Sequence, residues 1–155
     1  MKERVKLEVN GEAAEVAVEP RETLLDVLRE HLGLTGAHAG CEHGACGACT
    51  VLLDGEPVRA CLLFAVQCED HTITTIEGVG RPDALHPMME AFRRHHALQC
   101  GFCAPAMVLS AIALLESNAR PTEAEVREAL AGNLCRCTGY SGIVAAVLDT
   151  AGGGA

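Results

Sequence analysis

The chain opens with two stretches in which apolar and polar residues alternate, residues 5–9 and residues 14–18. Alternation with a period of two predicts half-buried β-strands. Between the stretches stand Asn10 and Gly11, a pair that favours a type I′ turn because both residue types tolerate left-handed backbone. The pattern therefore predicts a β-hairpin near the N-terminus.

A helix is predicted after this hairpin. Thr23 and Asp26 have the spacing of a capping box, apolar residues continue to Leu32, and Gly33 is placed to end the helix. Short apolar stretches bounded by turn residues then predict further strands. These are residues 51–53, 58–61 and 72–76. We expect residues 1–76 to form one small, β-rich domain with a helix.

The apolar pattern changes to helical spacing in the second half of the chain. Thr122 and Glu125 form a capping box before one of four predicted helices. The four are residues 85–98, 106–115, 126–130 and 143–148. Residues 77–83 contain two glycines and a proline, which is typical of a linker. The sequence thus predicts an α+β protein in which the linker joins residues 1–76 to a helical domain of residues 84–155.

Composition excludes several classes of function. With 12 Lys and Arg against 21 Asp and Glu in 155 residues, the formal net charge is −9, which opposes contact with a phosphate backbone. Aromatic residues make up only 3%, so stacking platforms for single-stranded nucleic acid are missing. No apolar stretch reaches the roughly 20 residues of a membrane span, and no signal peptide precedes the first strand. We expect a cytoplasmic protein with no membrane span and no nucleic-acid partner.

The nine cysteines point to metal or redox chemistry, because a cytoplasmic chain has no oxidising environment in which to pair them. Four of them follow the spacing Cys41-x4-Cys46-x2-Cys49 with a later Cys61, which is the plant-type spacing of a [2Fe-2S] cluster. Three glycines in the same loop allow the backbone to fold tightly and to point N–H groups at sulfur atoms. A zinc site with four cysteine ligands is the alternative.

A second set of four cysteines lies in the helical half, as Cys100 with Cys103 and Cys135 with Cys137. Each pair precedes a predicted helix, whose N-terminal dipole favours thiolate over thiol. This spacing is less specific, and zinc is again an alternative. Cys68 is left over and is predicted to be a free thiol.

Other kinds of site do not fit the sequence. A Rieske site built from Cys41, His43, Cys68 and His71 would leave three clustered cysteines unused. No cysteine pair is followed by the histidine of a covalent haem site, and no complete dinucleotide fingerprint is present. Nothing looks like a substrate pocket with an acid, a base or a nucleophile. We therefore assign no catalytic residue to this chain.

Three sequence blocks and one further cysteine carry a family resemblance. They are GCEHGACGACTV (residues 40–51), Cys61, QCGFC (residues 99–103) and GNLCRCTGY (residues 132–140). In them the chain resembles the small iron-sulfur subunit of the molybdenum hydroxylases, the family of xanthine dehydrogenase, aldehyde oxidoreductase and aerobic carbon monoxide dehydrogenase. The resemblance covers nearly the whole chain. The family usually continues QCGFC with Thr-Pro-Gly, whereas Ala104-Pro105-Ala106 stands here and lacks the possible capping hydroxyl.

The resemblance implies a β-grasp plant-type ferredoxin domain followed by a four-helix bundle domain, each with one [2Fe-2S] cluster. The implied ligands are Cys41, Cys46, Cys49 and Cys61 in the ferredoxin domain, and Cys100, Cys103, Cys135 and Cys137 in the helical domain. The helical-domain cluster is expected next to a molybdopterin dinucleotide on a large subunit, with Gln99 and Cys137 approaching the pterin. The ferredoxin-domain cluster is expected to face FAD on a medium subunit.

Because the chain ends at residue 155, both partners are expected to be separate polypeptides in a dimer of heterotrimers. The resemblance implies that electrons run from substrate to molybdenum, through the helical-domain and then the ferredoxin-domain cluster, to FAD. The reaction would be oxidation of an aldehyde, an N-heterocycle or carbon monoxide. A free-standing two-cluster ferredoxin and a zinc-stabilised adaptor are the alternatives. The apolar stretch of residues 106–115 argues against the first, since it suggests more apolar surface than a free carrier of this size can bury.

Overall fold

The computed structural model describes residues 1–153, so residues 154–155 of the predicted helical domain lie outside the described residues. Within residues 1–153, five strands form one sheet in the order β2-β1-β5-β3-β4. Strands β1 and β5 are parallel, and the other neighbours are antiparallel. The strands are β1 (Glu3–Val9), β2 (Glu12–Val18), β3 (Thr50–Leu53), β4 (Glu56–Arg59) and β5 (Thr72–Thr74).

The predicted N-terminal hairpin is confirmed. Strands β1 and β2 pair along their whole length, and Val9 lies opposite Glu12 at the turn. Asn10 and Gly11 both have positive φ angles, 54° and 77°, as a type I′ turn requires. This turn fixes the register, so the apolar residues of β1 all face the core.

The predicted first helix is also present. It begins as α1 (Leu24–Asp26) and continues as one wider, π-helical turn, η1 (Val27–His31). Thr23 Oγ1 accepts a hydrogen bond from Asp26 N (3.1 Å), and the Asp26 carboxylate accepts one from Thr23 N (3.0 Å). This capping box satisfies two backbone donors that a helix start would otherwise leave unpaired. The helix ends before Gly33, and its apolar side chains pack with those of β1 in one core.

Two predicted strands end earlier than expected. Strand β4 stops at Arg59, and the 3-10 turn η2 (Ala60–Leu62) takes Cys61 out of the sheet. Strand β3 begins at Thr50, directly opposite Arg59, and beyond this pair only a long hydrogen bond from Ala60 N to the Cys49 carbonyl oxygen (3.4 Å) continues the pairing. Strand β5 likewise gives way to the 3-10 turn η4 (Ile76–Gly78).

The four predicted helices are found in the described part of the second half. They are α2 (Pro87–Arg94), α3 (Ala104–Ser117), α4 (Glu123–Leu130) and α5 (Ser141–Ala151). Helix α2 is shorter than its apolar pattern suggested. Pro87 fixes its first turn, where His86 Nδ1 accepts a hydrogen bond from Met88 N, and His96 leaves the helical conformation with a φ of 49°. Helix α4 has the predicted capping box of Thr122 and Glu125.

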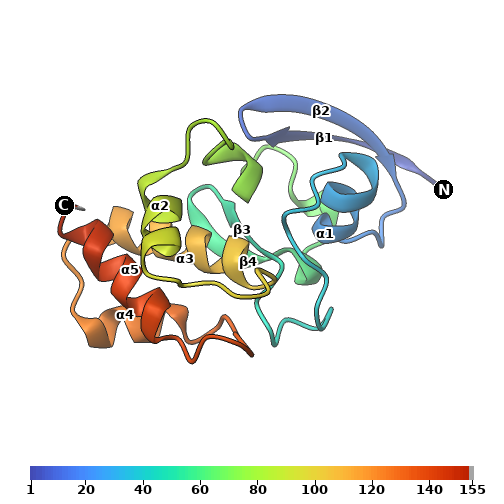
Figure 1. Cartoon of the computed structure of the whole chain (residues 1–155). Helices are drawn as coiled ribbons and strands as arrows, with labels where there is room; N and C mark the ends of the chain where they lie inside the picture. The colour runs from blue at the N-terminus through green and yellow to red at the C-terminus, as the bar shows by residue number, and fades with distance from the viewer. Residues whose placement is uncertain (154–155) are drawn as a thin grey trace.

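Helix α3 lies at the centre of the molecule, between the sheet and the other helices (Figure 1). It separates a first core, formed by the sheet and α1, from a second core among the helices. Seven consecutive residues, Ala106–Ile112, are buried. The expectation that residues 106–115 leave uncovered apolar surface is therefore wrong for residues 106–112, which this chain itself covers, while residues 113–115 are half-buried. None of the helices among residues 1–153 combines the length and apolar character that crossing a bilayer requires.

Two candidate metal centres

The first cysteine set (Cys41, Cys46, Cys49 and Cys61) is held by the glycine-rich loop before β3 and by turn η2. Gly44 and Gly47 adopt left-handed backbone, with φ angles of 82° and 75°. A Cβ at Gly40 would lie 2.8 Å from Cys46 Sγ, so a larger residue would push into the sulfur. The glycines therefore allow the loop to wrap its own cysteines, as the sequence predicted.

Backbone N–H groups point at the sulfur atoms of this loop. Cys46 N and His43 N lie 3.3 and 3.5 Å from Cys41 Sγ, and Ala48 N lies 3.4 Å from Cys46 Sγ. The two amides lower the pKa of Cys41 to about 6. Donors of this kind favour thiolate, which is the form that binds metal.

The other two thiols of the first set are buried and adjoin each other. Burial and, to a lesser extent, the neighbouring Cys49 thiol together raise the pKa of Cys61 to about 11. A metal bound here would have to displace a proton from Cys61. Cys41 with Cys46 and Cys49 with Cys61 thus form two pairs of neighbouring thiols.

The second cysteine set (Cys100, Cys103, Cys135 and Cys137) also divides into two pairs. Cys137 Sγ and Cys100 Sγ are 3.6 Å apart at the surface. Cys103 adjoins Cys135, but it is buried, and burial raises the pKa of Cys103 to about 12. Cys103 caps α3, where the helix dipole favours thiolate as predicted, but burial acts in the opposite direction and has the larger effect on its pKa.

Residues of the GNLCRCTGY block form hydrogen bonds with Cys135 of the second set. Thr138 N and Thr138 Oγ1 lie 3.4 and 3.1 Å from Cys135 Sγ. The Tyr140 hydroxyl accepts a hydrogen bond from Cys135 N (2.9 Å). All four cysteines of this set line one hollow of about 400 Å³ together with Phe102, Leu134, Arg136 and Tyr140.

This donor arrangement fits a binuclear cluster. A [2Fe-2S] cluster needs four thiolates, two on each iron, and each set offers two pairs. A zinc ion instead requires its four ligands to converge on one point at about 2.3 Å. Among residues 1–153, no three His, Cys, Asp or Glu side chains surround such a single point.

Cys68 lies apart from both sets. Its side chain is 1% exposed within the first core, and its Sγ is 3.6 Å from the carbonyl oxygen of Phe64. Burial raises its pKa, so the thiol stays protonated. The structure thus gives Cys68 the surroundings of a core residue and not those of a ligand.

Gln99 is exposed beside the second set. Its side-chain Nε2 donates a hydrogen bond to the carbonyl oxygen of Cys137 (3.2 Å). The structure therefore brings together the two residues for which the resemblance implied a pterin contact, at an open edge of the molecule.

The two cysteine-bearing loops touch each other, which the sequence patterns did not reveal. Leu134 N donates a hydrogen bond to the carbonyl oxygen of Cys46 (2.8 Å). The His38 ring stacks on Phe102 with 4.6 Å between centroids, and His38 Nδ1 lies 2.7 Å from the carbonyl oxygen of Phe102. Only the three-dimensional arrangement of the loops identifies these contacts.

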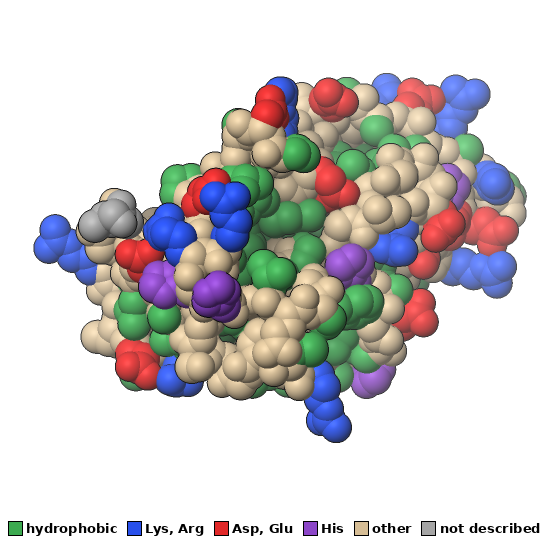
Figure 2. Space-filling view, in the orientation of Figure 1, with side chains coloured by type: hydrophobic (Ala, Val, Ile, Leu, Met, Phe, Trp, Pro, Cys, Tyr) green, Lys and Arg blue, Asp and Glu red, His purple; other side chains and the backbone are tan. Residues whose placement is uncertain are grey.

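Exposed apolar side chains gather beside the two cysteine sets. Apart from Met1, each large apolar side chain that is exposed among residues 1–153 lies within three residues, along the sequence, of a cysteine of one of the two sets. They are Leu62, Phe64, Leu98, Phe102 and Leu134. On the face shown in Figure 2, charged side chains stand mainly towards the ends and edges, with apolar and backbone atoms between them.

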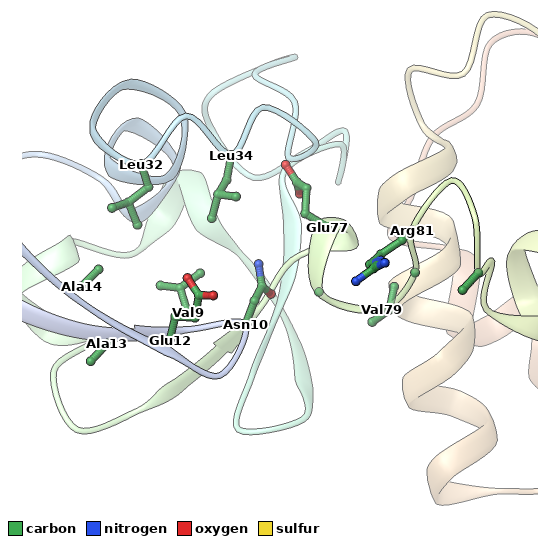
Figure 3. A pocket seen from close by; sticks show the side chains of 13 residues that line it. Val9, Asn10, Glu12, Ala13, Ala14, Leu32, Leu34, Glu77, Val79 and Arg81 are labelled. Carbon is green, nitrogen blue, oxygen red and sulfur yellow. The ribbon is translucent and has the colours of Figure 1, made fainter.

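A pocket of about 720 Å³ lies elsewhere, between the β1–β2 hairpin, the segment after η1 and the predicted linker. Figure 3 shows Leu32 and Leu34 on one side of it and Glu77 and Arg81 of the predicted linker on another. It contains no cysteine of either set. We assign it no part in the metal centres.

Comparison with known proteins agrees with two cluster-binding regions. A family model described as a 2Fe-2S iron-sulfur cluster binding domain matches residues 7–73, and one described as a [2Fe-2S] binding domain matches residues 75–148. Over 148 residues the chain is 57% identical to the nicotine 6-hydroxylase small subunit of Paenarthrobacter nicotinovorans, covering 96% of this chain and 89% of that protein.

Two further relatives extend this likeness. The chain is 47% identical to the caffeine dehydrogenase subunit gamma of Pseudomonas sp. (strain CBB1), covering 92% of this chain and 87% of that protein. It superposes on a chain of quinoline 2-oxidoreductase from Pseudomonas putida 86 with a TM-score of 0.94 and 49% identity, covering 97% and 93% of the two chains. The similarity therefore extends over nearly the whole of each chain.

Proposed function

We propose that this chain, which belongs to the family of small iron-sulfur subunits of the molybdenum hydroxylases, conducts electrons between two different partner subunits of an oxidoreductase complex. The observation that carries the proposal is the pair of four-cysteine sets, each beside exposed apolar surface and each on a loop that contacts the other. A [2Fe-2S] cluster takes up and releases one electron at a time. The chain's own task is then to hold two such clusters close together and to present each to a partner.

The proposed ligands follow the observed pairs of thiols. Cys41 and Cys46 would bind one iron of the first cluster, and Cys49 with Cys61 the other. In the second cluster the pairs are Cys100 with Cys137 and Cys103 with Cys135. We assign residues 1–76 to a β-grasp ferredoxin domain and residues 84–155 to a four-helix domain. The sheet with its packed helix and the separate helical core support that assignment.

The proposed partners are a large subunit with molybdopterin dinucleotide and a medium subunit with FAD, in a dimer of heterotrimers. The second set would face the large subunit, because Cys100, Cys137 and Gln99 are exposed and the exposed Leu98 and Leu134 are close to them in the sequence. The first set would serve the medium subunit, next to the exposed Leu62. A free-standing ferredoxin is less consistent with these exposed apolar groups and with relatives that are named as subunits.

The substrate class proposed for the complex is an N-heterocycle. Nicotine, caffeine and quinoline, which appear in the names of the three relatives described above, are all nitrogen heterocycles. No group on this chain selects among them, because the substrate pocket would belong to the large subunit. N-Heterocycles are therefore the first compounds to screen for turnover by the assembled complex.

Metal analysis of the purified protein tests the core of the proposal. Two [2Fe-2S] domains predict four iron atoms and four acid-labile sulfides per chain. Low-temperature EPR after reduction should show two distinct signals. Stoichiometric zinc, or half the expected iron, would contradict the proposal.

The order of the two clusters is tested in the assembled complex by removing one ligand at a time. In Cys49→Ser, substrate should still reduce the second cluster under anaerobic conditions. In Cys103→Ser, substrate should leave the first cluster oxidised, although dithionite should still reduce it from solvent. In both variants, FAD should remain oxidised after substrate is added. Reduction of the first cluster by substrate at the wild-type rate in Cys103→Ser would show that the order is wrong.

A further inference from the structure

A buried polar side chain, Asn133, lies where the two cysteine-bearing loops meet. It is 3% exposed and stands two residues before Cys135. Buried amides are expensive unless their hydrogen bonds are satisfied, so such a residue needs partners that are held in place. Sequence reasoning placed Asn133 in the GNLCRCTGY block but gave it no role.

Asn133 connects three separate parts of the chain. Its Nδ2 donates to the carbonyl oxygen of Gly47 (3.2 Å), which lies between two cysteines of the first set. The same nitrogen donates to Thr50 Oγ1 at the start of β3 (3.2 Å). Its Oδ1 accepts a hydrogen bond from Ser110 Oγ on α3 (3.1 Å). One side chain thus ties the second cysteine loop to the first and to the central helix.

A second side chain, Arg59, reinforces the same junction. Arg59 Nη1 donates to Thr50 Oγ1 (2.7 Å), and Nη2 donates to the carbonyl oxygen of Gly132 (2.6 Å). The Thr50 hydroxyl itself donates to the carbonyl oxygen of Gly47 (2.6 Å). A hydroxyl has one donor and two acceptor sites, and in Thr50 all three are in use. We call the side chains of Thr50, Arg59, Ser110 and Asn133 the polar seam.

The backbones of the two cysteine-bearing loops are in direct contact at the polar seam. A Cβ at Gly47 would lie 2.3 Å from the carbonyl oxygen of Gly132 and 3.0 Å from Asn133 Cα. Both Thr50 and Ser110 are buried, at 1% and 5% exposure. No buried side-chain nitrogen or oxygen among residues 1–153 lacks a hydrogen-bond partner. Hydrogen bonds of fixed length and direct backbone contact therefore define one position of each loop relative to the other.

We propose that Asn133 is a positioning residue that sets the separation and mutual orientation of the two cysteine sets. This inference rests on the proposed electron-transfer function, because two fixed clusters are useful where electrons pass between them. Asn133 binds no iron in this proposal. It acts through Gly47 on the first set and through its own loop on the second.

The test uses the assembled complex with both clusters reduced. Each reduced [2Fe-2S] cluster is paramagnetic, and the splitting that each causes in the EPR signal of the other falls with the cube of their separation. Asn133→Leu keeps the size of the side chain but removes every hydrogen bond, leaving the Ser110 hydroxyl without its partner. We expect a smaller splitting and slower electron transfer between clusters after rapid substrate addition, with both EPR signals and the iron content retained.

Two further variants make the result decisive. In Arg59→Lys, a single ammonium takes the place of the guanidinium that donates to both Thr50 and Gly132. This variant should reduce the splitting as Asn133→Leu does, without disturbing a buried position. Asn118→Leu is the matched control. Asn118 sits at the opposite end of α3 from Cys103, and its side chain bonds to Arg120 N (3.1 Å) and to the Glu125 carboxylate. It should leave the splitting unchanged.

Each outcome has one meaning. Unchanged splitting in Asn133→Leu and Arg59→Lys, with both clusters present, would overturn the positioning role. Selective loss of one cluster in Asn133→Leu would overturn it as well, because the residue would then serve cluster binding. If Asn133→Leu does not fold, Arg59→Lys decides alone. Failure of the proposed function itself would appear separately, as wild-type protein that lacks two [2Fe-2S] signals.

Discussion

Replacing Gly47 by alanine tests how closely the two cysteine loops are packed. Gly47 has a φ of 75°, where an L-residue costs about 1–2 kcal/mol relative to its preferred backbone. The added Cβ would also lie 2.3 Å from the carbonyl oxygen of Gly132. That oxygen belongs to backbone, so relief requires the loops to move apart, and overpacking of this kind typically costs about 1–3 kcal/mol.

Gly11→Ala provides a matched control. Gly11 has nearly the same φ, 77°, but a Cβ added there would meet no atom within 4 Å beyond its chain neighbours. It should therefore cost only the backbone contribution of about 1–2 kcal/mol, against about 2–5 kcal/mol for Gly47→Ala. The difference between the two variants isolates the contact between the loops.

The measurement is the midpoint of thermal loss of visible circular dichroism from the clusters, taken anaerobically at one heating rate. For a chain of this size, about 1 kcal/mol corresponds to a shift of roughly 2–4 °C. We expect Gly47→Ala to lose its signal several degrees below Gly11→Ala. Equal midpoints for the two variants would refute the close contact between the loops.

Two further substitutions test individual residues. Cys68→Ser should keep both EPR signals because Cys68 lies outside both sets. A hydroxyl in the apolar core should lower the free energy of unfolding by about 1–3 kcal/mol, partly offset by a hydrogen bond to the nearby Phe64 carbonyl. Loss of an EPR signal would show that the wrong cysteine was taken as spare. Gln99→Ala should reduce turnover and molybdenum-cofactor retention in the complex without changing iron content, since Gln99 is an exposed partner of Cys137. Unchanged turnover and retention would exclude the pterin contact.

The sequence alone predicted the local elements and the grouping of the cysteines. A period of two, the Asn10–Gly11 turn and the Thr23 capping box act over a few neighbouring residues, so their outcome is visible in the order of residue types. The cysteine spacing is informative for the same reason, since one loop supplies three thiols of the first set. Cys68 could likewise be set apart because no ligand spacing includes it.

Tertiary structure decided how the two halves meet. The end of β4 at Arg59 depends on where its partner strand begins, and the burial of α3 depends on what covers it from both sides. Burial also raises the pKa of Cys103 against the influence of the helix end on which it sits. The contacts of Asn133 join residues as many as 86 positions apart, and no short-range pattern encodes such a pair. Local preferences are short-ranged, whereas the separation of the two cysteine sets is set by buried contacts that exist only once the chain has folded.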